Sequence, residues 1–245
     1  MTTTSESNYE NETLTSPLDH MSSRAIGLPR EMLALIHKRE YIRSIIDTYF
    51  YIPILVVGIF FNIVAALALW KRAKQKSTFN YLFALSIVDS FSLVAVTLLG
   101  LVRSFFHVDI QKIIDCNVYW LAVNQTRKMS SWFLVLASSE RALLVKFPTK
   151  AKFWFTPKRA RIAMLVTTAI LLASNWLYFG GMATDKTTPL SRFFNTCIGR
   201  TPALSYYRDH VSPWVNIIMF SFLPFLCLLI SNGVIIREFF IAKKR

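Results

Sequence analysis

The sequence predicts an all-α membrane protein, folded as a helical bundle of five transmembrane helices. Hydrophobic residues make up 53% of the 245 residues. Charged residues make up only 17%, whereas they are about a quarter of the residues in soluble domains. A helix needs roughly 20 residues nearly free of charge to cross about 30 Å of hydrocarbon. Five stretches of the chain meet that requirement, and most of the basic residues lie between them.

Charge is nearly absent from each of the five expected helices. The first and fourth are uncharged throughout, and the fifth is uncharged as far as Ile236. The second contains only Asp89, whereas the third carries the adjacent pair Arg127 and Lys128 in its interior. We expect these helices over residues 48–70, 77–102, 116–141, 162–184 and 211–240, within a transmembrane domain of residues 48–245.

Residues 1–47 form a polar leading segment that we expect to be extracellular and mostly disordered. No apolar core follows a basic start there, so the segment does not resemble a cleaved signal peptide. Apolar residues recur at roughly helical spacing from Glu31 to Ile46, which predicts a juxtamembrane helix. Asn11 begins an Asn-Glu-Thr triplet, which predicts N-glycosylation outside the cell.

The basic residues predict the orientation of the helices, because Lys and Arg near span ends are retained in the cytoplasm. Three strongly basic segments fall on one side of the bundle: the loop after the first helix, the stretch from Arg141 to Arg161, and the end of the chain at Lys243–Arg245. We therefore expect a multi-pass protein of the plasma membrane with its N-terminus outside and its C-terminus inside. The net charge of +14 is scattered between spans, which argues against a nucleic-acid partner.

Two of the three cysteines are expected on the oxidising side of the membrane. Cys116 lies at the outer end of the third helix and Cys197 lies in the loop between the fourth and fifth helices. Their common location predicts a disulfide that ties this loop over the bundle, with two unpaired thiols as the alternative. Cys227 lies inside the fifth helix, where a small buried side chain is expected.

Polar side chains inside the membrane are costly unless they find partners. Asp89, Asn62 and Ser130 lie at comparable depth in the first three helices, which predicts a polar cluster able to hold water or an ion. A merely hydrogen-bonded or protonated Asp89 is the alternative. Arg127 lies about 16 Å from the outer end of its helix; it either meets an acidic group of a ligand, pairs with Asp89, or lines a solvated cavity without a specific partner.

Several of these residues together resemble the rhodopsin family of G-protein-coupled receptors. Arg141 follows Cys116 by 25 residues and comes directly after Glu140. The resemblance covers the whole membrane part and also includes Asn62, Leu85, Asp89, Pro148, Pro224 and Asn232. It implies that these are the first five helices of a seven-helix receptor.

The resemblance implies roles for the inner end of the third helix and for the fifth. Glu140 would hold Arg141 at rest, and Arg141 would turn into the G-protein site on activation, with Pro148 in the same coupling region. The alternative for Glu140 and Arg141 is an ion pair that only anchors the helix end. Pro224 would kink the fifth helix. Departures from the family pattern are Ala142 after the acid-Arg pair and the absence of Trp near Thr168.

The ligand implied by the resemblance is a neuropeptide of the FMRFamide-like type, because Val123 replaces the Asp typical of amine receptors and the outer loop is long. We expect the ligand pocket to include Trp120, Val123 and Arg127.

The expected partners are an extracellular ligand, a heterotrimeric G protein and the lipid bilayer. No catalytic residue, cofactor or metal site is predicted. Since two helices of the family are missing, we expect a fragment or a truncated, non-signalling product; a channel or transporter fragment is the other alternative.

Overall fold

The structure is a computed structural model that describes Leu35, Lys38, Arg39, Tyr41 and Ile42, and residues 45–106, 114–184 and 197–244. The chain divides into two compact units, Met1–Ile46 and Asp47–Arg245. In the first unit, the described positions from Leu35 onward are helical and exposed, at places where the sequence predicts a juxtamembrane helix. Asn11 lies outside the described residues, so its glycosylation stays a prediction.

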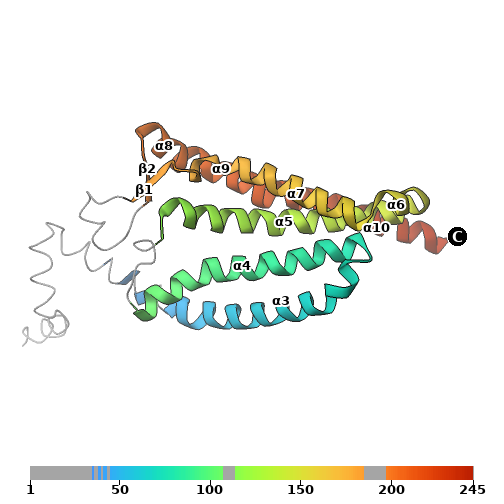
Figure 1. The fold of residues 1–245 in the computed structure, drawn as a ribbon, viewed down its shortest axis with the longest axis horizontal. Helices are drawn as coiled ribbons and strands as arrows, with labels where there is room; N and C mark the ends of the chain where they lie inside the picture. Colours follow the sequence, from blue (N-terminus) through green and yellow to red (C-terminus); the bar gives the residue numbers. More distant parts are fainter. Residues whose placement is uncertain are drawn as a thin grey trace, which may run out of the picture. The chain divides into compact units, whose positions relative to one another are not determined.

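The second unit is a bundle of long helices that lie side by side (Figure 1). Helix α5 is central, because it packs against α4, α7 and α10, whereas α3 packs against α4. A short helix, α6, connects α5 to α7. The helices are α3 (Ile52–Ala73), α4 (Ser77–Phe106), α5 (Cys116–Lys146), α6 (Pro148–Trp154), α7 (Pro157–Ser174), α8 (Pro202–Tyr206), α9 (Ser212–Ile217) and α10 (Leu223–Lys244).

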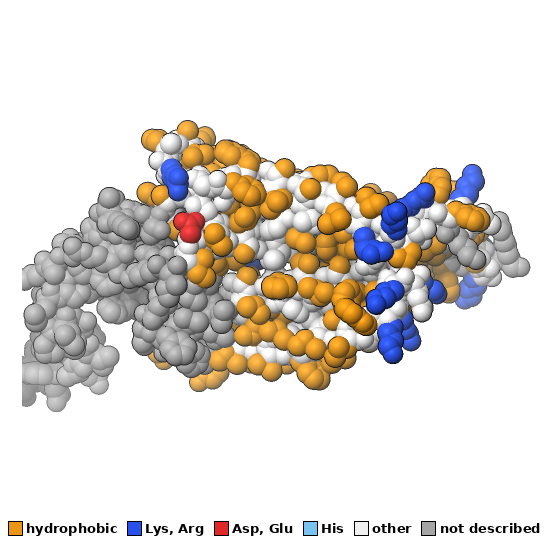
Figure 2. Space-filling model, in the orientation of Figure 1, with side chains coloured by type: hydrophobic (Ala, Val, Ile, Leu, Met, Phe, Trp, Pro, Cys, Tyr) orange, Lys and Arg blue, Asp and Glu red, His pale blue; other side chains and the backbone are white. Residues whose placement is uncertain are grey.

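Membrane character is plain in three of the described helical stretches. Tyr49–Ala73, Ser77–Thr97 and Pro202–Lys244 are long and apolar enough to cross a bilayer. Helix α5 is not among these three stretches, because Arg127, Lys128 and several polar side chains make it less apolar. Apolar side chains cover the visible flank of the helices (Figure 2). The chain is therefore an all-α membrane bundle, as the sequence predicts, with one small β-hairpin added.

The predicted boundaries of the fourth helix are wrong at both ends. Helix α7 begins at Pro157 and ends at Ser174, and part of the expected helix is instead strand β1 (Met182–Thr184). The helix includes Lys158, Arg159 and Arg161 because exposed basic side chains at a helix end reach the water. It ends early because Asn175 caps it and Gly180 follows with a φ of 112°, a conformation that favours glycine.

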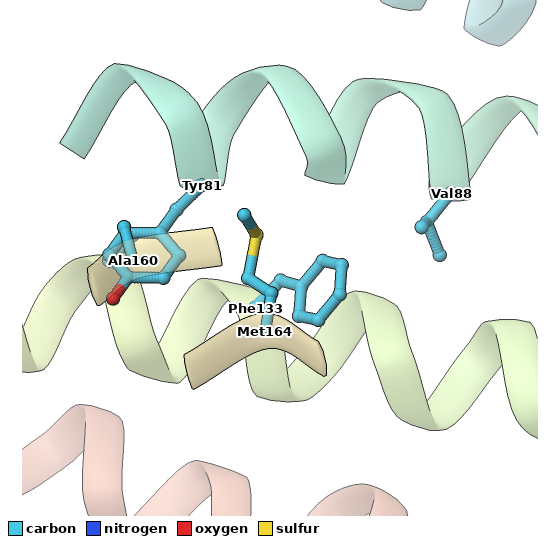
Figure 3. Close-up of a cluster of buried hydrophobic side chains, with 6 residues drawn as sticks. Tyr81, Val88, Phe133, Ala160 and Met164 are labelled. Carbon is cyan, nitrogen blue, oxygen red and sulfur yellow. The ribbon is translucent and has the colours of Figure 1, made fainter. Parts of the chain in front are cut away.

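Apolar packing near the basic end of the helices joins α4, α5 and α7. Tyr81 and Val88 of α4 meet Phe133 of α5, with Ala160 and Met164 of α7 beside them (Figure 3). All of these side chains are at least nine-tenths buried. Small Ala160 lets α7 approach closely, while Phe133 fills the space between the three helices.

The fifth helical stretch is interrupted by π-helical turns, each ending two residues before a proline. Segment η5 (Tyr207–Val211) precedes Pro213 and segment η6 (Ile218–Phe222) precedes Pro224; likewise, η1 (Asp47–Tyr51) precedes Pro53. Proline lacks an N–H and its ring crowds the carbonyl four residues earlier. A wider turn relieves this crowding, and π-turns of this kind are a known cause of helix bends.

The η6 turn leaves one carbonyl in need of a donor from another helix. The Leu223 N–H donates to the Ile218 carbonyl, five residues back. The Met219 carbonyl would then take its bond from residue 224, which is a proline without an N–H. Instead, the indole N–H of Trp132 in α5 donates to the Met219 carbonyl at 2.9 Å. Next to Pro224, where the sequence predicts a kink, the structure has a wider helical turn that is hydrogen-bonded to α5.

Replacing Trp132 by Phe should lower the thermal stability of the purified protein by about 1–3 kcal/mol, the usual cost of a buried carbonyl left unpaired. In the Pro224→Ala background the same change should cost less, because residue 224 then carries an N–H that can reach the carbonyl. Trp214→Phe, at a side chain that is 67% exposed, is the control for loss of the indole. Equal losses at Trp132 in both backgrounds, measured as thermal midpoints in detergent, would contradict this account.

Candidate functional site

Most of the residues predicted to act in binding and signalling lie along α5, and a disulfide fixes the N-terminal end of this helix. Cys116, the first residue of the helix, is bonded to Cys197, 81 residues later in the sequence. Cys197 belongs to strand β2 (Cys197–Gly199), which pairs antiparallel with β1. The predicted link between the outer loop and the third helix is therefore present in the structure.

Asn117 fastens the same hairpin to α5 by hydrogen bonds. Its side chain donates to the Met182 carbonyl at 3.0 Å and accepts from the Met182 N–H at 2.9 Å. Asp115 caps the helix by accepting from the Asn117 side chain and from its backbone N–H. These bonds hold the pKa of the Asp115 carboxyl below its usual value. The N-terminal end of α5 is thus held by both covalent and polar contacts.

The three residues predicted to line the ligand pocket have different surroundings. Trp120 is half-buried and packs against the cluster around the disulfide, which includes Leu177, Tyr178 and Met182. Val123 is only 2% exposed, so it is a packing residue in the described structure. Arg127 is exposed and pairs with no described acid. Of the three alternatives for this residue, pairing with Asp89 is therefore not what the structure shows; Asp89 is bonded to Ser130 instead.

The predicted polar cluster is present in part. The Ser130 hydroxyl of α5 donates to the Asp89 carboxyl of α4 at 2.5 Å. Asn62 lies half-buried on α3, and its side chain has no hydrogen bond to another described residue. The structure therefore joins Asp89 to Ser130 and leaves Asn62 out. One hydrogen bond from Ser130 gives the carboxyl a partner within the bundle, as a polar group in hydrocarbon requires.

Glu140, near the C-terminal end of α5, is bonded to α4 and not to Arg141. Its Oε1 accepts from the hydroxyls of Ser77 and Thr78, both at 2.6 Å. Oε2 has no hydrogen-bond partner in the described part of the chain, although Glu140 is only 2% exposed. Ser77 and Thr78 are the first residues of α4, and a carboxylate at a helix N-terminus is stabilised by the helix dipole.

The prediction that Glu140 holds Arg141 is wrong in its geometry. Arg141 is exposed, and no ion pair joins it to Glu140 among the described residues. Consecutive residues of a helix point about 100° apart and do not face each other. Glu140 therefore turns towards α4 while Arg141 turns to the surface. Pro148 is exposed at the start of α6, after the end of α5.

The comparison with known families identifies the protein class. Residues 52–185, more than half of the chain, match the family described as serpentine type 7TM GPCR chemoreceptor Srx. The chain belongs to this chemoreceptor family. It is thus a multi-pass membrane protein of the G-protein-coupled receptor type, and its family is not one of enzymes. No curated protein matches the chain.

The receptor also contains a buried polar network for which the sequence alone indicated no role. Lys128 is only 2% exposed; its ammonium donates to Asn175 Oδ1 at 2.6 Å and to the Ser174 hydroxyl at 3.3 Å. Asn175 in turn donates to Gln125 Oε1 at 2.8 Å. Ser174 is the last residue of α7 and Asn175 is its cap, so the ammonium lies at the negative end of that helix dipole.

A signal for this network was present in the sequence. Gln125 and Lys128 are three residues apart and therefore share one face of α5. Adjacent Arg127 points elsewhere, so only one of the two cations could face α7. The position of Asn175 opposite them depends on where α7 ends, which the uncharged stretch did not indicate.

Losing the disulfide should lower the amount of receptor at the cell surface. Cys116→Ser and Cys197→Ser should each remove a link that restricts a loop of about 80 residues, worth on the order of 4 kcal/mol. The double variant should be no worse than either single one, because the second cysteine then has no partner. Cys227→Ser, at a free thiol, is the control. Normal surface labelling of the single variants would contradict a stabilising role.

Asn175→Leu should destabilise the receptor by about 2–3 kcal/mol, because it leaves the buried ammonium of Lys128 with one weaker acceptor. Adding Lys128→Met should recover part of that loss, since the double variant buries neither the charge nor the amide. Arg127→Met is the matched control: it removes a neighbouring but exposed cation and should change the thermal midpoint little. If the double variant is less stable than Asn175→Leu, the network does not act as described.

Proposed function

We propose that this chemoreceptor binds an extracellular ligand beside the outer half of α5 and couples to a G protein at the inner end of the same helix. The observation that carries the proposal is a stripe on α5 formed by Arg127, Leu134 and Arg141. Arg127 and Arg141 are exposed, and Leu134 is 40% exposed. Residues seven apart lie close to one face of a helix, so the stripe runs from mid-helix to the inner end.

A guanidinium near the middle of a membrane helix is costly against lipid. Arg127 is therefore better placed if the stripe lines a water-filled cavity that a ligand can enter. An acidic group on the ligand would supply the charge that no described acid gives to Arg127. The proposal that the ligand is a neuropeptide rests on the sequence resemblance alone. The family is named for chemoreceptors, so a small acidic compound from outside is the second ligand class to test.

The inner end of the stripe supports coupling to a G protein. Arg141 is exposed, five residues before the end of α5. Figure 2 shows Lys and Arg side chains gathered at one end of the bundle. The positive charge at this end favours a cytoplasmic location. We propose that Glu140 restrains the resting receptor by fastening α5 to the start of α4 through Ser77 and Thr78. A change in the position of α5 would release this bond without breaking any ion pair to Arg141.

The rhodopsin-family roles proposed for Arg141, Pro148 and Pro224 are consistent with their positions. Arg141 and Pro148 lie at the exposed inner end, on either side of the end of α5. Pro224, the second residue of α10, follows the η6 turn, which the bond between Trp132 and Met219 joins to α5. A receptor-like protein that does not signal, and a channel or transporter fragment lined by Asp89 and Arg127, are the alternatives.

The test is nucleotide exchange on added G protein by a seven-helix receptor that contains this chain as its first five helices. Arg141→Ala should abolish exchange and leave ligand binding intact. Glu140→Gln and Thr78→Val should each raise basal exchange about fivefold, the effect of removing roughly 1 kcal/mol from the resting state.

Arg161→Ala, at an exposed cation on the same end, is the control for lost charge. If Thr78→Val leaves basal exchange unchanged while Glu140→Gln raises it, the restraint does not act through α4. Normal coupling by Arg141→Ala would remove the proposed role of that residue. A receptor that never promotes exchange would favour the alternatives.

A further inference from the structure

The connection between α5 and α7 combines exposed aromatic rings with unpaired cations. We call residues 147–161 the basic-aromatic segment; it contains α6 and the first turn of α7. Phe153 is 79% exposed and Trp154 is 62% exposed. Ala151 is only 2% exposed, so α6 packs through this small residue and turns its largest apolar side chains outward.

The cations of the segment lie close to these two rings. Lys150 precedes Trp154 by four residues, so the two side chains share one face of α6. The Arg159 guanidinium donates to the carbonyls of Phe153 and Trp154, at 3.4 and 3.2 Å. These bonds cap the end of α6 and hold a positive charge beside the exposed rings. Lys158 is also exposed, one residue earlier.

None of these cations is neutralised by an acid in the described part of the chain. Lys150, Lys158 and Arg159 form no ion pair there. Among the described residues from Arg141 to Arg161 there is no Asp or Glu. Glu140, just before this stretch, is buried and bonded to Ser77 and Thr78. The segment is therefore a local excess of positive charge, at the end of the bundle where Figure 2 shows Lys and Arg gathered.

We propose that the basic-aromatic segment is a binding surface for the headgroup of an anionic membrane phospholipid. Trp and Phe side chains at a helix end favour the interfacial layer of the bilayer. Lys and Arg immediately beside a membrane helix attract anionic lipids of the cytoplasmic leaflet. Phe153 and Trp154 enter the interface, while Lys150, Lys158 and Arg159 contact the phosphate groups.

A lipid fits this surface better than a protein partner does. The segment follows α5 directly and runs into α7, so both of its ends are joined to helices of the membrane bundle. Anionic lipid is thus present at this level whenever the receptor is in its membrane. The inference uses the proposed cytoplasmic location of this end and does not use G-protein coupling, so the two can fail separately.

The test uses the full chain purified in a neutral detergent, with dioctanoyl phosphatidylinositol bisphosphate as the probe and dioctanoyl phosphatidylcholine as the neutral control. Native mass spectrometry counts bound lipid, and titration gives the affinity. Replacing Lys150, Lys158 and Arg159 together by Gln should weaken binding at least tenfold, since each interfacial cation contributes about fivefold. Phe153→Ser with Trp154→Ser should also weaken binding while keeping every charge.

The matched control is replacement of Lys71, Lys74 and Lys76 by Gln, which removes the same charge from the last turn of α3 and the loop that follows it. This control should bind almost as tightly as the unmodified chain. Equal losses in the two triple variants would mean that only net charge matters and would overturn the proposed surface. Soluble inositol trisphosphate binding as tightly as the lipid would show a headgroup site without membrane contact, and would also overturn it. Preferential binding of a G protein by the segment, with no preference among lipids, would assign the surface to that partner instead.

Discussion

The bundle depends on one constraint: a polar side chain on a helix in hydrocarbon must find its partner on a neighbouring helix. Helix α5 carries most such side chains. Lys128 bonds to the end of α7, Ser130 to Asp89 of α4, Trp132 to the widened turn before α10, and Glu140 to the start of α4. Apolar packing alone gives little orientation in lipid, because lipid chains are as apolar as the side chains. These polar bonds therefore fix how α5 is rotated between its neighbours.

Features that depend on composition could be predicted from the sequence. The residue at which a helix ends, and the residue of another helix that lies opposite a given atom, could not. The membrane class follows from uncharged length, and the bond between Cys116 and Cys197 follows from their common side of the membrane. The end of α7 could not be predicted from charge, because the uncharged stretch continues past Ser174 to Thr184, the last residue of β1. Pro224 indicated a disturbance of the helix, but the partner of the freed Met219 carbonyl depends on the position of Trp132 in another helix.

Both adjacent charged pairs of α5 show why sequence neighbours are poor predictors of contact. Of Arg127 and Lys128, the first is exposed and the second is buried against α7. Of Glu140 and Arg141, the first is buried against α4 and the second is exposed. In each pair, the 100° step between consecutive residues separates the two side chains. The hydrogen-bond partners of Glu140 are therefore Ser77 and Thr78 across the helix interface, and not its neighbour Arg141.

The same rotation brings the two arginines together on one stripe. Since Lys128 and Glu140 are each turned towards a neighbouring helix, Arg127 and Arg141 are both left on the remaining face, with Leu134 between them. A ligand that draws Arg127 towards it would exert a force on α5 itself, and the bond from Glu140 to α4 resists rotation or sliding of that helix. Because a rigid helix moves as a unit, a shift at its outer half reaches Arg141 directly. In the proposed mechanism, the strength of the bond between α5 and α4 would set how much ligand-binding energy is needed before Arg141 changes position.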